Sequence, residues 1–157
     1  MFLLNVCHAL NEAKVRYGVV GGYAVALHGA VRGTVDLDLV LSLGEKNFVS
    51  AEKVFRALGL ESRLPLDARQ VIRFREEYIR NRNLTAWSFY DPVSPKNQLD
   101  IVLTEDLNEM ETQVIRIRGV KVRIASIPSL IRMKIRSGRP QDVEDVRALK
   151  ELLKNEK

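Results

Sequence analysis

Residues 35–40 read Val-Asp-Leu-Asp-Leu-Val, and this alternation of acidic and apolar residues limits what the chain can fold into. Successive side chains of a β-strand point to opposite faces, so Asp36 and Asp38 share one face and the leucines occupy the other. The apolar face needs a core to pack against. Two carboxylates held side by side on a strand repel each other unless a cation lies between them. The segment therefore predicts a half-buried strand with a cation site on its polar face.

A Gly-Gly pair precedes this strand, separated from it by a short helical stretch. The apolar run Tyr17–Val20 is typical of a buried strand, and it leads directly into Gly21 and Gly22. Glycine admits positive φ and lets a ligand approach the backbone closely. Backbone N–H groups at the start of a helix bind phosphate groups well. An ordinary strand-to-helix turn would explain a lone Gly-Gly pair, but the aspartates downstream favour a phosphate-binding turn.

The whole segment resembles the nucleotidyltransferases of the DNA polymerase beta superfamily. The small branch closest to it has the signature Gly-Gly, Ala, His-Gly, Arg, Thr, Asp, a hydrophobic residue and Asp. In this chain the signature falls on Gly21, Gly22, Ala24, His28, Gly29, Arg32, Thr34, Asp36, Leu37 and Asp38. Many members have serine at the second position of the turn, where this chain has glycine. The resemblance implies a polymerase-beta-like palm fold.

Patterns along the rest of the chain agree with that fold. Helical periodicity covers residues 1–14, 45–59, 71–78, 128–138 and the segment after residue 141, whose buried face we expect to carry Val143, Val146, Leu149 and Leu153. Strand patterns cover residues 84–90 and 98–104, and residues 114–124 predict a hairpin around Gly119. We expect a single domain over residues 1–157, of α/β (α+β) class, with a mixed β-sheet covered by helices mainly on one face.

Asp100 is the best candidate for a third carboxylate of the site. It lies in the otherwise apolar run Leu99–Leu103, where an ionised side chain is costly unless it has a partner or faces a polar cleft. The resemblance implies a third acid in such a strand, beside the strand with the aspartate pair. A carboxylate paired with an arginine at a strand end is the alternative. Asp91 and Asp106 lie in turn-like contexts and are weaker candidates.

The resemblance also implies a reaction. Asp36, Asp38 and Asp100 would be the catalytic residues and the ligands of two Mg²⁺ ions, with Mn²⁺ as the alternative ion. The enzyme would move a nucleoside monophosphate from an NTP to a hydroxyl group of an RNA, a protein or a small molecule, and release pyrophosphate. The competing interpretation is an inactive interaction module that keeps the fold, for example as part of a toxin–antitoxin pair.

Three residues of the signature have less certain roles. Arg32 would bind phosphate oxygens with its planar fork, or equally act as the counter-ion of the two aspartates. Thr34 is a β-former and suits the start of the strand. His28 ends a short apolar helix, where histidine is more often a packing residue than a catalyst, so we leave it out of the catalytic set.

The C-terminal segment adds a second point of resemblance. In the same branch, a lysine and an aspartate from this region line the nucleotide cleft. Lys134 corresponds to the lysine and Asp142 to the acid, which implies that Lys134 neutralises the triphosphate. Asp142 would orient Lys134 or Arg139, or simply cap the last helix. The sequence leaves the role of Asp145 open.

The charge of the chain favours anionic partners. Its formal net charge is +5 at pH 7, which suits phosphorylated or polyanionic ligands. Basic residues gather in the hairpin and, in a second cluster, upstream of it: Arg116, Arg118, Lys121 and Arg123, and Arg69, Arg73, Arg75, Arg80 and Arg82. Such faces are usually just solvated. If either is functional, an RNA or a nucleotide-bearing acceptor is the expected partner.

The cysteine content and the N-terminal segment bear on location. Cys7 is the only cysteine, so no internal disulfide can form, which suits a reducing cytoplasm. The first residues are amphipathic, without the features of a signal peptide or a membrane span, so no membrane association is expected. Because the chain has little room for an acceptor domain, a homodimer or a partner protein is expected to complete it.

Overall fold

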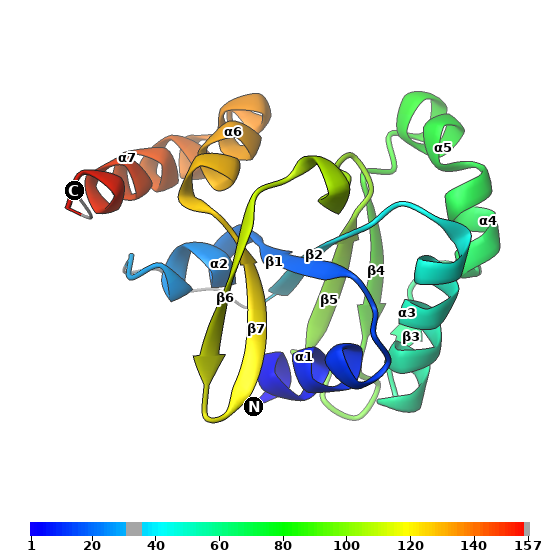
Figure 1. The fold of residues 1–157 in the computed structure, drawn as a ribbon. Helices are drawn as coiled ribbons and strands as arrows, with labels where there is room; N and C mark the ends of the chain where they lie inside the picture. The colour runs from blue at the N-terminus through cyan, green and yellow to red at the C-terminus, as the bar shows by residue number, and fades with distance from the viewer. Residues whose placement is uncertain (31–35, 156–157) are drawn as a thin grey trace.

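The computed structural model of the protein describes residues 1–30 and 36–155, which form a mixed β-sheet with helices around it (Figure 1). Within these residues the sheet has seven strands in the order β3-β4-β5-β2-β1-β7-β6. The strands are β1 (Tyr17–Val20), β2 (Asp36–Leu41), β3 (Glu61–Ser62), β4 (Ala86–Tyr90), β5 (Gln98–Val102), β6 (Thr112–Ile117) and β7 (Val120–Ala125). The predicted α/β (α+β) class with a mixed sheet is confirmed.

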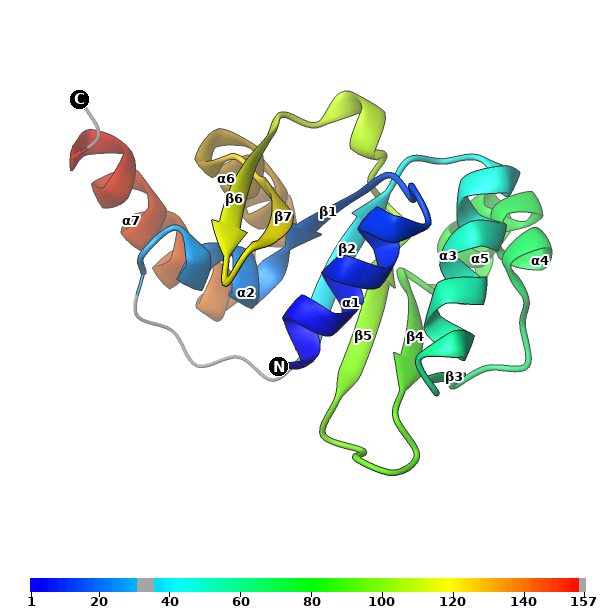
Figure 2. The same ribbon diagram turned by 60° about the horizontal axis from the view of Figure 1, so that its bottom comes forward.

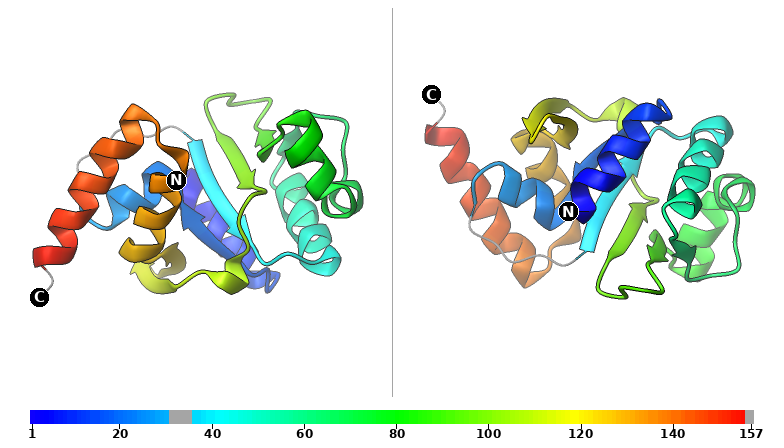
Figure 3. Two further views of the ribbon diagram at one scale, coloured as in Figure 1. Left: turned by 90° about the horizontal axis from the view of Figure 1, so that it is seen from above. Right: turned by 90° about the horizontal axis from the view of Figure 1, so that it is seen from below.

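The helices are α1 (Phe2–Glu12), α2 (Gly21–Leu27), α3 (Glu45–Ala57), α4 (Ala68–Arg73), α5 (Arg75–Arg82), α6 (Ile127–Ser137) and α7 (Pro140–Asn155), with a 3₁₀ turn η1 (Leu107–Glu109). The predicted cover of helices on one face of the sheet is confirmed in α1 and α3, and further helices lie on the other side of the central strands. Figure 3 shows α1 in front of the central strands from below and α6 in front of them from above. The apolar face of the sheet is covered by α1 and α3, whereas α6 borders the polar face.

The core on the apolar face is built from aliphatic strand residues and aromatic rings. Leu37 and Leu39 of β2 are completely buried there. Phe48 of α3 stacks on Trp87 of β4 with ring centroids 6.4 Å apart, and Phe55 packs on the neighbouring Phe89 at 5.0 Å. Aromatic pairs of this kind contribute beyond their buried area. The apolar half of the alternating strand therefore has the core that its pattern requires.

The central strand β2 fixes the register of the polar face. It pairs antiparallel with β1 and parallel with β5, and lies between them in Figure 2. In this register Asp38 lies opposite Val20 on one side and Asp100 on the other. Paired residues of neighbouring strands project from the same face of a sheet. The acids of β2 and β5 are thus brought to one face by strand pairing alone.

The segment of residues 67–83 differs in detail from the single helix predicted over residues 71–78. It forms two helices, α4 and α5, which meet at Phe74. A capping box begins α4, since the Asp67 side chain accepts from the Gln70 N–H and the Gln70 side chain accepts from the Asp67 N–H. No residue of α5 is buried, so its sequence carries no apolar stripe that could reveal its bounds.

The buried face of α7 is also different from the predicted one. Val143, expected inside, is 56% exposed, whereas Asp142, Asp145 and Leu149 are buried. Val146 is only partly buried. Apolar periodicity was the wrong guide here because the two aspartates have buried or nearby cationic partners, described below, which offset the cost of burying their charge.

The remaining predicted elements are confirmed. β6 and β7 form an antiparallel hairpin whose turn contains Gly119 at a φ of 81°. Pro128 lies in the first turn of α6, and Gly138 ends that helix in the left-handed conformation. Among the described residues, no helix combines the length and apolar character that crossing a membrane requires.

Candidate active site

Three aspartates from the two central strands face one cleft. Asp36 and Asp38 of β2 project from the face opposite Leu37 and Leu39, and Asp100 of β5 is the register partner of Asp38. All three line a cavity of about 850 Å³ that is also bordered by residues of α6. The structure therefore brings together the three acids that the sequence singled out.

The carboxyl groups of this cleft carry more negative charge than their surroundings balance. Burial and the charges of Asp100 and Asp36 raise the pKa of Asp38 to about 7, and a hydrogen bond with Asp100 acts in the same direction. Burial and Asp100 also raise the pKa of Asp36, against a smaller opposite effect of Arg63. A group of acids that resists ionisation in this way would be stabilised by a bound cation.

The donor set fits a divalent cation by its chemistry. Mg²⁺ and Mn²⁺ take carboxylate oxygens, and the cleft offers three carboxyl groups whose mutual repulsion a cation would relieve. In the part of the chain that the structure describes, however, no three His, Cys, Asp or Glu side chains are grouped as a ready ligand set. The side chains would have to adjust around a bound ion.

The Gly-Gly pair lies at the end of β1 against the Asp38 carboxylate. Gly21 has a φ of 66°, and a Cβ atom built on it would overlap the carboxyl group of Asp38. Gly22 is buried in the first turn of α2, and both glycines line the cleft. Only glycine satisfies the positive φ and the close approach at the first position. The pair thus has a packing role at Asp38 in addition to the predicted contact with phosphate.

Helices α6 and α7 supply a cationic wall opposite the aspartates. Lys134 is buried, with its Nζ 2.8 Å from Asp145 Oδ2 and 3.5 Å from Asp142 Oδ1. The positive charge of Lys134 lowers the pKa of Asp38, so it acts across the cleft. Asp142 contacts both cations proposed for it, because its Oδ2 also accepts from Arg139 Nε at 2.8 Å. Asp145, whose role the sequence left open, is the closer partner of Lys134.

Low pH should weaken the contact between α6 and α7 because it protonates Asp142. Burial acts to raise its pKa, but hydrogen bonds from Arg139 and Ser137 and the nearby positive charges outweigh this and lower it to about 2. A carboxyl group with a lowered pKa stabilises the fold above its unfolded pKa of about 4, here by about 2 kcal/mol, and loses this contribution as the pH falls toward 2. Asp142→Asn should therefore be less stable than the wild type at pH 6, with about half of the difference gone by pH 3.

Urea unfolding of both proteins between pH 6 and pH 3 measures this difference. Asp91→Asn is the matched control, since Asp91 only accepts from the backbone N–H groups of Val93 and Ser94 in a turn and an asparagine oxygen can do the same. A stability difference for Asp142→Asn that stays constant with pH would contradict the assignment.

The other residues singled out in the sequence lie elsewhere or outside the described residues. Arg32 and Thr34 belong to the latter group. His28 Nε2 lies 2.8 Å from the carbonyl oxygen of Ala125, which agrees with a packing role. Asp106 caps η1 and accepts from the Leu43 N–H, so like Asp91 it serves the backbone.

Sequence reasoning missed three charged residues near the cleft. Arg63 stacks over the Tyr90 ring at 4.7 Å and lowers the pKa of Asp36. Glu105 and Arg136 line the cavity and form an ion pair of 2.9 Å. Arg63 belongs to no sequence motif that would identify it. Glu105 and Arg136 are 31 residues apart, so no local pattern predicts their contact.

A known protein family matches nearly the whole chain. A family model described as "Nucleotidyl transferase of unknown function (DUF2204)" matches residues 2–157. No curated protein sequence matches the chain significantly.

Solved structures with a similar fold include antibiotic-modifying enzymes. The solution structure of the antibiotic-resistance factor ANT(2'')-Ia has a TM-score of 0.66 and 17% identity, over 97% of this chain and 82% of that one. Its crystal structure with adenylyl-2''-tobramycin gives 0.62 and 18%, over 95% and 86%. The lincosamide adenylyltransferase LnuA, bound to lincomycin, gives 0.58 and 14%, over 91% and 90%. At such identities the likeness shows a shared fold.

Proposed function

The chain belongs to the DUF2204 family of nucleotidyl transferases, and we propose that it moves a nucleoside monophosphate from an NTP to a hydroxyl group of an acceptor, with release of pyrophosphate. The observation that carries the proposal is the convergence of Asp36, Asp38 and Asp100 on one cleft, where burial and mutual repulsion raise the pKa of Asp38 to about 7. Carboxyl groups gathered at such a cost are typical of a functional site.

Divalent cations are part of the proposal. Asp36, Asp38 and Asp100 would hold two Mg²⁺ ions, with Mn²⁺ as a substitute. When bound, such ions neutralise phosphate charge and lower the pKa of an attacking hydroxyl group. The unbalanced negative charge of the cleft supports this assignment.

The chain's own residues divide the work between two substrates. Asp36 and Asp38 serve the nucleotide, and Asp100 serves the acceptor and takes up the proton of its hydroxyl group. The hydroxyl oxygen bonds to the α-phosphorus, the bond from that phosphorus to the bridging oxygen of the β-phosphate breaks, and pyrophosphate leaves with the electron pair.

The triphosphate needs positive charge around it. Lys134 is held in place by Asp142 and Asp145, and Arg139 is held by Asp142 while its side chain stays 73% exposed at the cleft. We assign both to the β- and γ-phosphates, with Arg32 as a further contact. Backbone N–H groups at Gly21 and Gly22 would bind the phosphates beside Asp38.

The inactive alternative has no support from the cleft. A binding module has no need to keep three carboxyl groups whose mutual repulsion destabilises the fold. Because the single cysteine, Cys7, is a free and buried thiol, we place the enzyme in the reducing cytoplasm.

The function is tested with NTPs labelled at the α-phosphate. Each NTP is incubated with the protein, Mg²⁺ and separate fractions of cellular RNA, protein and small molecules. We expect label on one fraction, none with EDTA, and none when the label is on the γ-phosphate. Acceptor labelled from γ-labelled NTP would mean phosphoryl transfer, and NTP binding without product in any fraction would indicate a binding module.

A further inference from the structure

A second cavity opens where β1 and β7 run apart. The two strands pair only at Val19 and Ile124 among the described residues, and Figure 1 shows them diverging from there. A cavity of about 670 Å³ lies in this region, with buried Tyr17 and Leu107 among its lining residues. It is separate from the candidate active site, because the two cavities have no lining residue in common. A polar hollow of this size can hold a ligand of its own.

The charged residues that line this cavity are all basic. They are Lys14, Arg16, Lys121 and Arg123, all of them exposed. No acidic side chain among the described residues lines the cavity, and none of the ion pairs found there involves these four. Arg123 is held at the wall by a hydrogen bond of 2.9 Å from its Nη1 to Thr112 Oγ1. The cavity therefore presents positive charge that no acidic side chain of residues 1–30 or 36–155 pairs with in an ion pair.

The adjoining hairpin extends this charge at a cost to its own stability. Arg116 of β6 lies directly opposite Lys121 of β7 in the strand register. Like charges directly opposite each other destabilise a strand pair. Arg118, in the turn, adds another cation and adopts a positive φ of 49°, which is uncommon for a residue with a side chain. An anion bound along the hairpin would reduce the repulsion between Arg116 and Lys121.

The extent of the charge indicates a polymer. The basic residues of the cavity alone could bind the phosphate groups of a single nucleotide, but further basic residues continue along the hairpin beyond the cavity. Tyr17, the ring that lines the cavity, is only 3% exposed, so no base can stack on it. Recognition would then be through phosphate groups, which is how proteins bind nucleic acids without reading their sequence.

We infer that this basic wedge, formed by Lys14, Arg16, Lys121, Arg123, Arg116 and Arg118, binds the sugar-phosphate backbone of a nucleic-acid acceptor. The inference rests on the proposed nucleotidyl transfer and names its acceptor class. Arg16 immediately precedes β1, and Val20, at the end of that strand and roughly 13 Å farther along an extended chain, lines the active-site cleft. A strand bound at the wedge can therefore place its terminal hydroxyl group beside Asp100.

Fluorescence anisotropy with a single-stranded RNA oligonucleotide tests the wedge. Arg116→Gln with Lys121→Gln should weaken binding about 20-fold at 0.1 M salt and make the slope of log affinity against log salt shallower by about 1.4, because two phosphate contacts are lost. Melting temperature should not fall, since the variant removes an opposed like-charge pair. Lys14→Asn with Arg16→Gln should weaken binding similarly without touching the hairpin.

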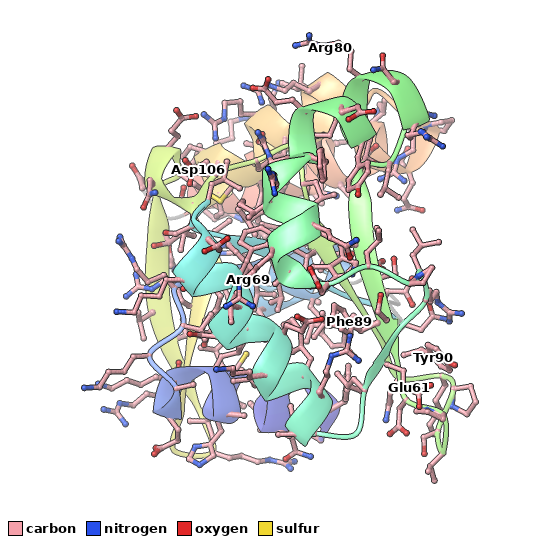
Figure 4. All side chains as sticks on the ribbon, turned by 90° about the vertical axis from the view of Figure 1, so that its right-hand side faces the viewer. Glu61, Arg69, Arg80, Phe89, Tyr90 and Asp106 are labelled. Atoms are coloured by element: carbon pink, nitrogen blue, oxygen red, sulfur yellow. The ribbon has the colours of Figure 1, made fainter. Side chains whose placement is uncertain are left out.

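The matched control is Arg69→Gln with Arg80→Gln. This variant also removes two positive charges, but from α4 and α5, on the face of the molecule shown in Figure 4. It should bind RNA within about twofold of the wild type. If both variants bind RNA equally weakly, the effect comes from net charge alone and the inference is wrong. The inference is also wrong if the hairpin variant binds RNA with wild-type affinity.

Competition identifies the ligand class. Unlabelled RNA should displace the probe far better than poly-L-glutamate of equal charge or than AMP. Equal displacement by poly-L-glutamate or by AMP would overturn the nucleic-acid assignment. Because the assay contains neither NTP nor a divalent ion, it can fail while transfer to another acceptor succeeds, and it can succeed in a protein that transfers nothing.

Discussion

Replacing Asp36 and Asp38 together with asparagine should lower nucleotidyl transfer by at least about a thousandfold, because a metal-binding pair is worth several kcal/mol of transition-state stabilisation. NTP with Mg²⁺ should raise the melting temperature of the wild type, since a ligand bound only by the folded state stabilises it. The double variant should lose the Mg²⁺-dependent part of that rise. Transfer is followed with α-labelled NTP and binding by thermal shift.

The same variant should be more stable than the wild type when no ligand is present. The pKa of Asp38 is raised in the folded state, so its ionisation costs stability as the pH rises from about 4 to 7. Asparagine carries no such charge, and the melting temperature at pH 8 should increase. A variant that is more stable yet inactive cannot owe its inactivity to unfolding.

Asp91→Asn with Asp106→Asn is the matched control for charge and residue type. Both aspartates accept hydrogen bonds from backbone N–H groups away from the cleft, which asparagine can also accept. This control should keep both transfer and the thermal shift. If the Asp36 and Asp38 variant still shows the full Mg²⁺-dependent shift, the nucleotide binds somewhere else.

The polar face of the site could be predicted because short-range patterns determine it. Alternation in β2 places Asp36 and Asp38 on one face whatever the rest of the chain does. Asp100 stood out because a charged residue inside an apolar strand requires a reason. Its position beside Asp38 depends on the parallel pairing of β2 and β5, which the resemblance implied and no local pattern contains.

Local patterns could not predict the cationic wall, because it depends on contacts between helices; only the resemblance implied that Lys134 and Asp142 line the cleft. Asp142 and Asp145 look like exposed residues of a helix start, and Val143 looks like a core residue. The rotation of α7 about its axis is decided instead by Lys134, which α6 presents to both aspartates. Burying two aspartates in preference to a valine is favourable only when such cationic partners are present. Apolar periodicity carries no information about a partner on another helix.

The site also contains groups that cost the fold local stability. Gly21 leaves the space beside its backbone to the Asp38 carboxyl group, and burial and two neighbouring acids oppose the ionisation of Asp38. Selection for stability alone would replace such groups. Their joint presence on neighbouring strands supports a cleft shaped by its ligands.

Replacing Asp100 alone with asparagine should separate transfer from nucleotide binding. If Asp100 serves the acceptor hydroxyl, its loss removes general-base assistance, and transfer should fall about a hundredfold or more. Asp36 and Asp38 remain to serve the nucleotide, so NTP affinity with Mg²⁺ should stay within about threefold of the wild type. Transfer rates and NTP affinity, measured on the same preparation, give the two readouts.

The asymmetry between the two variants is what identifies the division of labour. Asp100 is also one of the charges that raise the pKa of Asp38, so Asp100→Asn should let NTP bind with Mg²⁺ at a lower pH than in the wild type. A residue with a purely structural role would not produce that change. Equal losses of binding and transfer would move Asp100 to the nucleotide side, and transfer at the wild-type rate would remove it from the catalytic set.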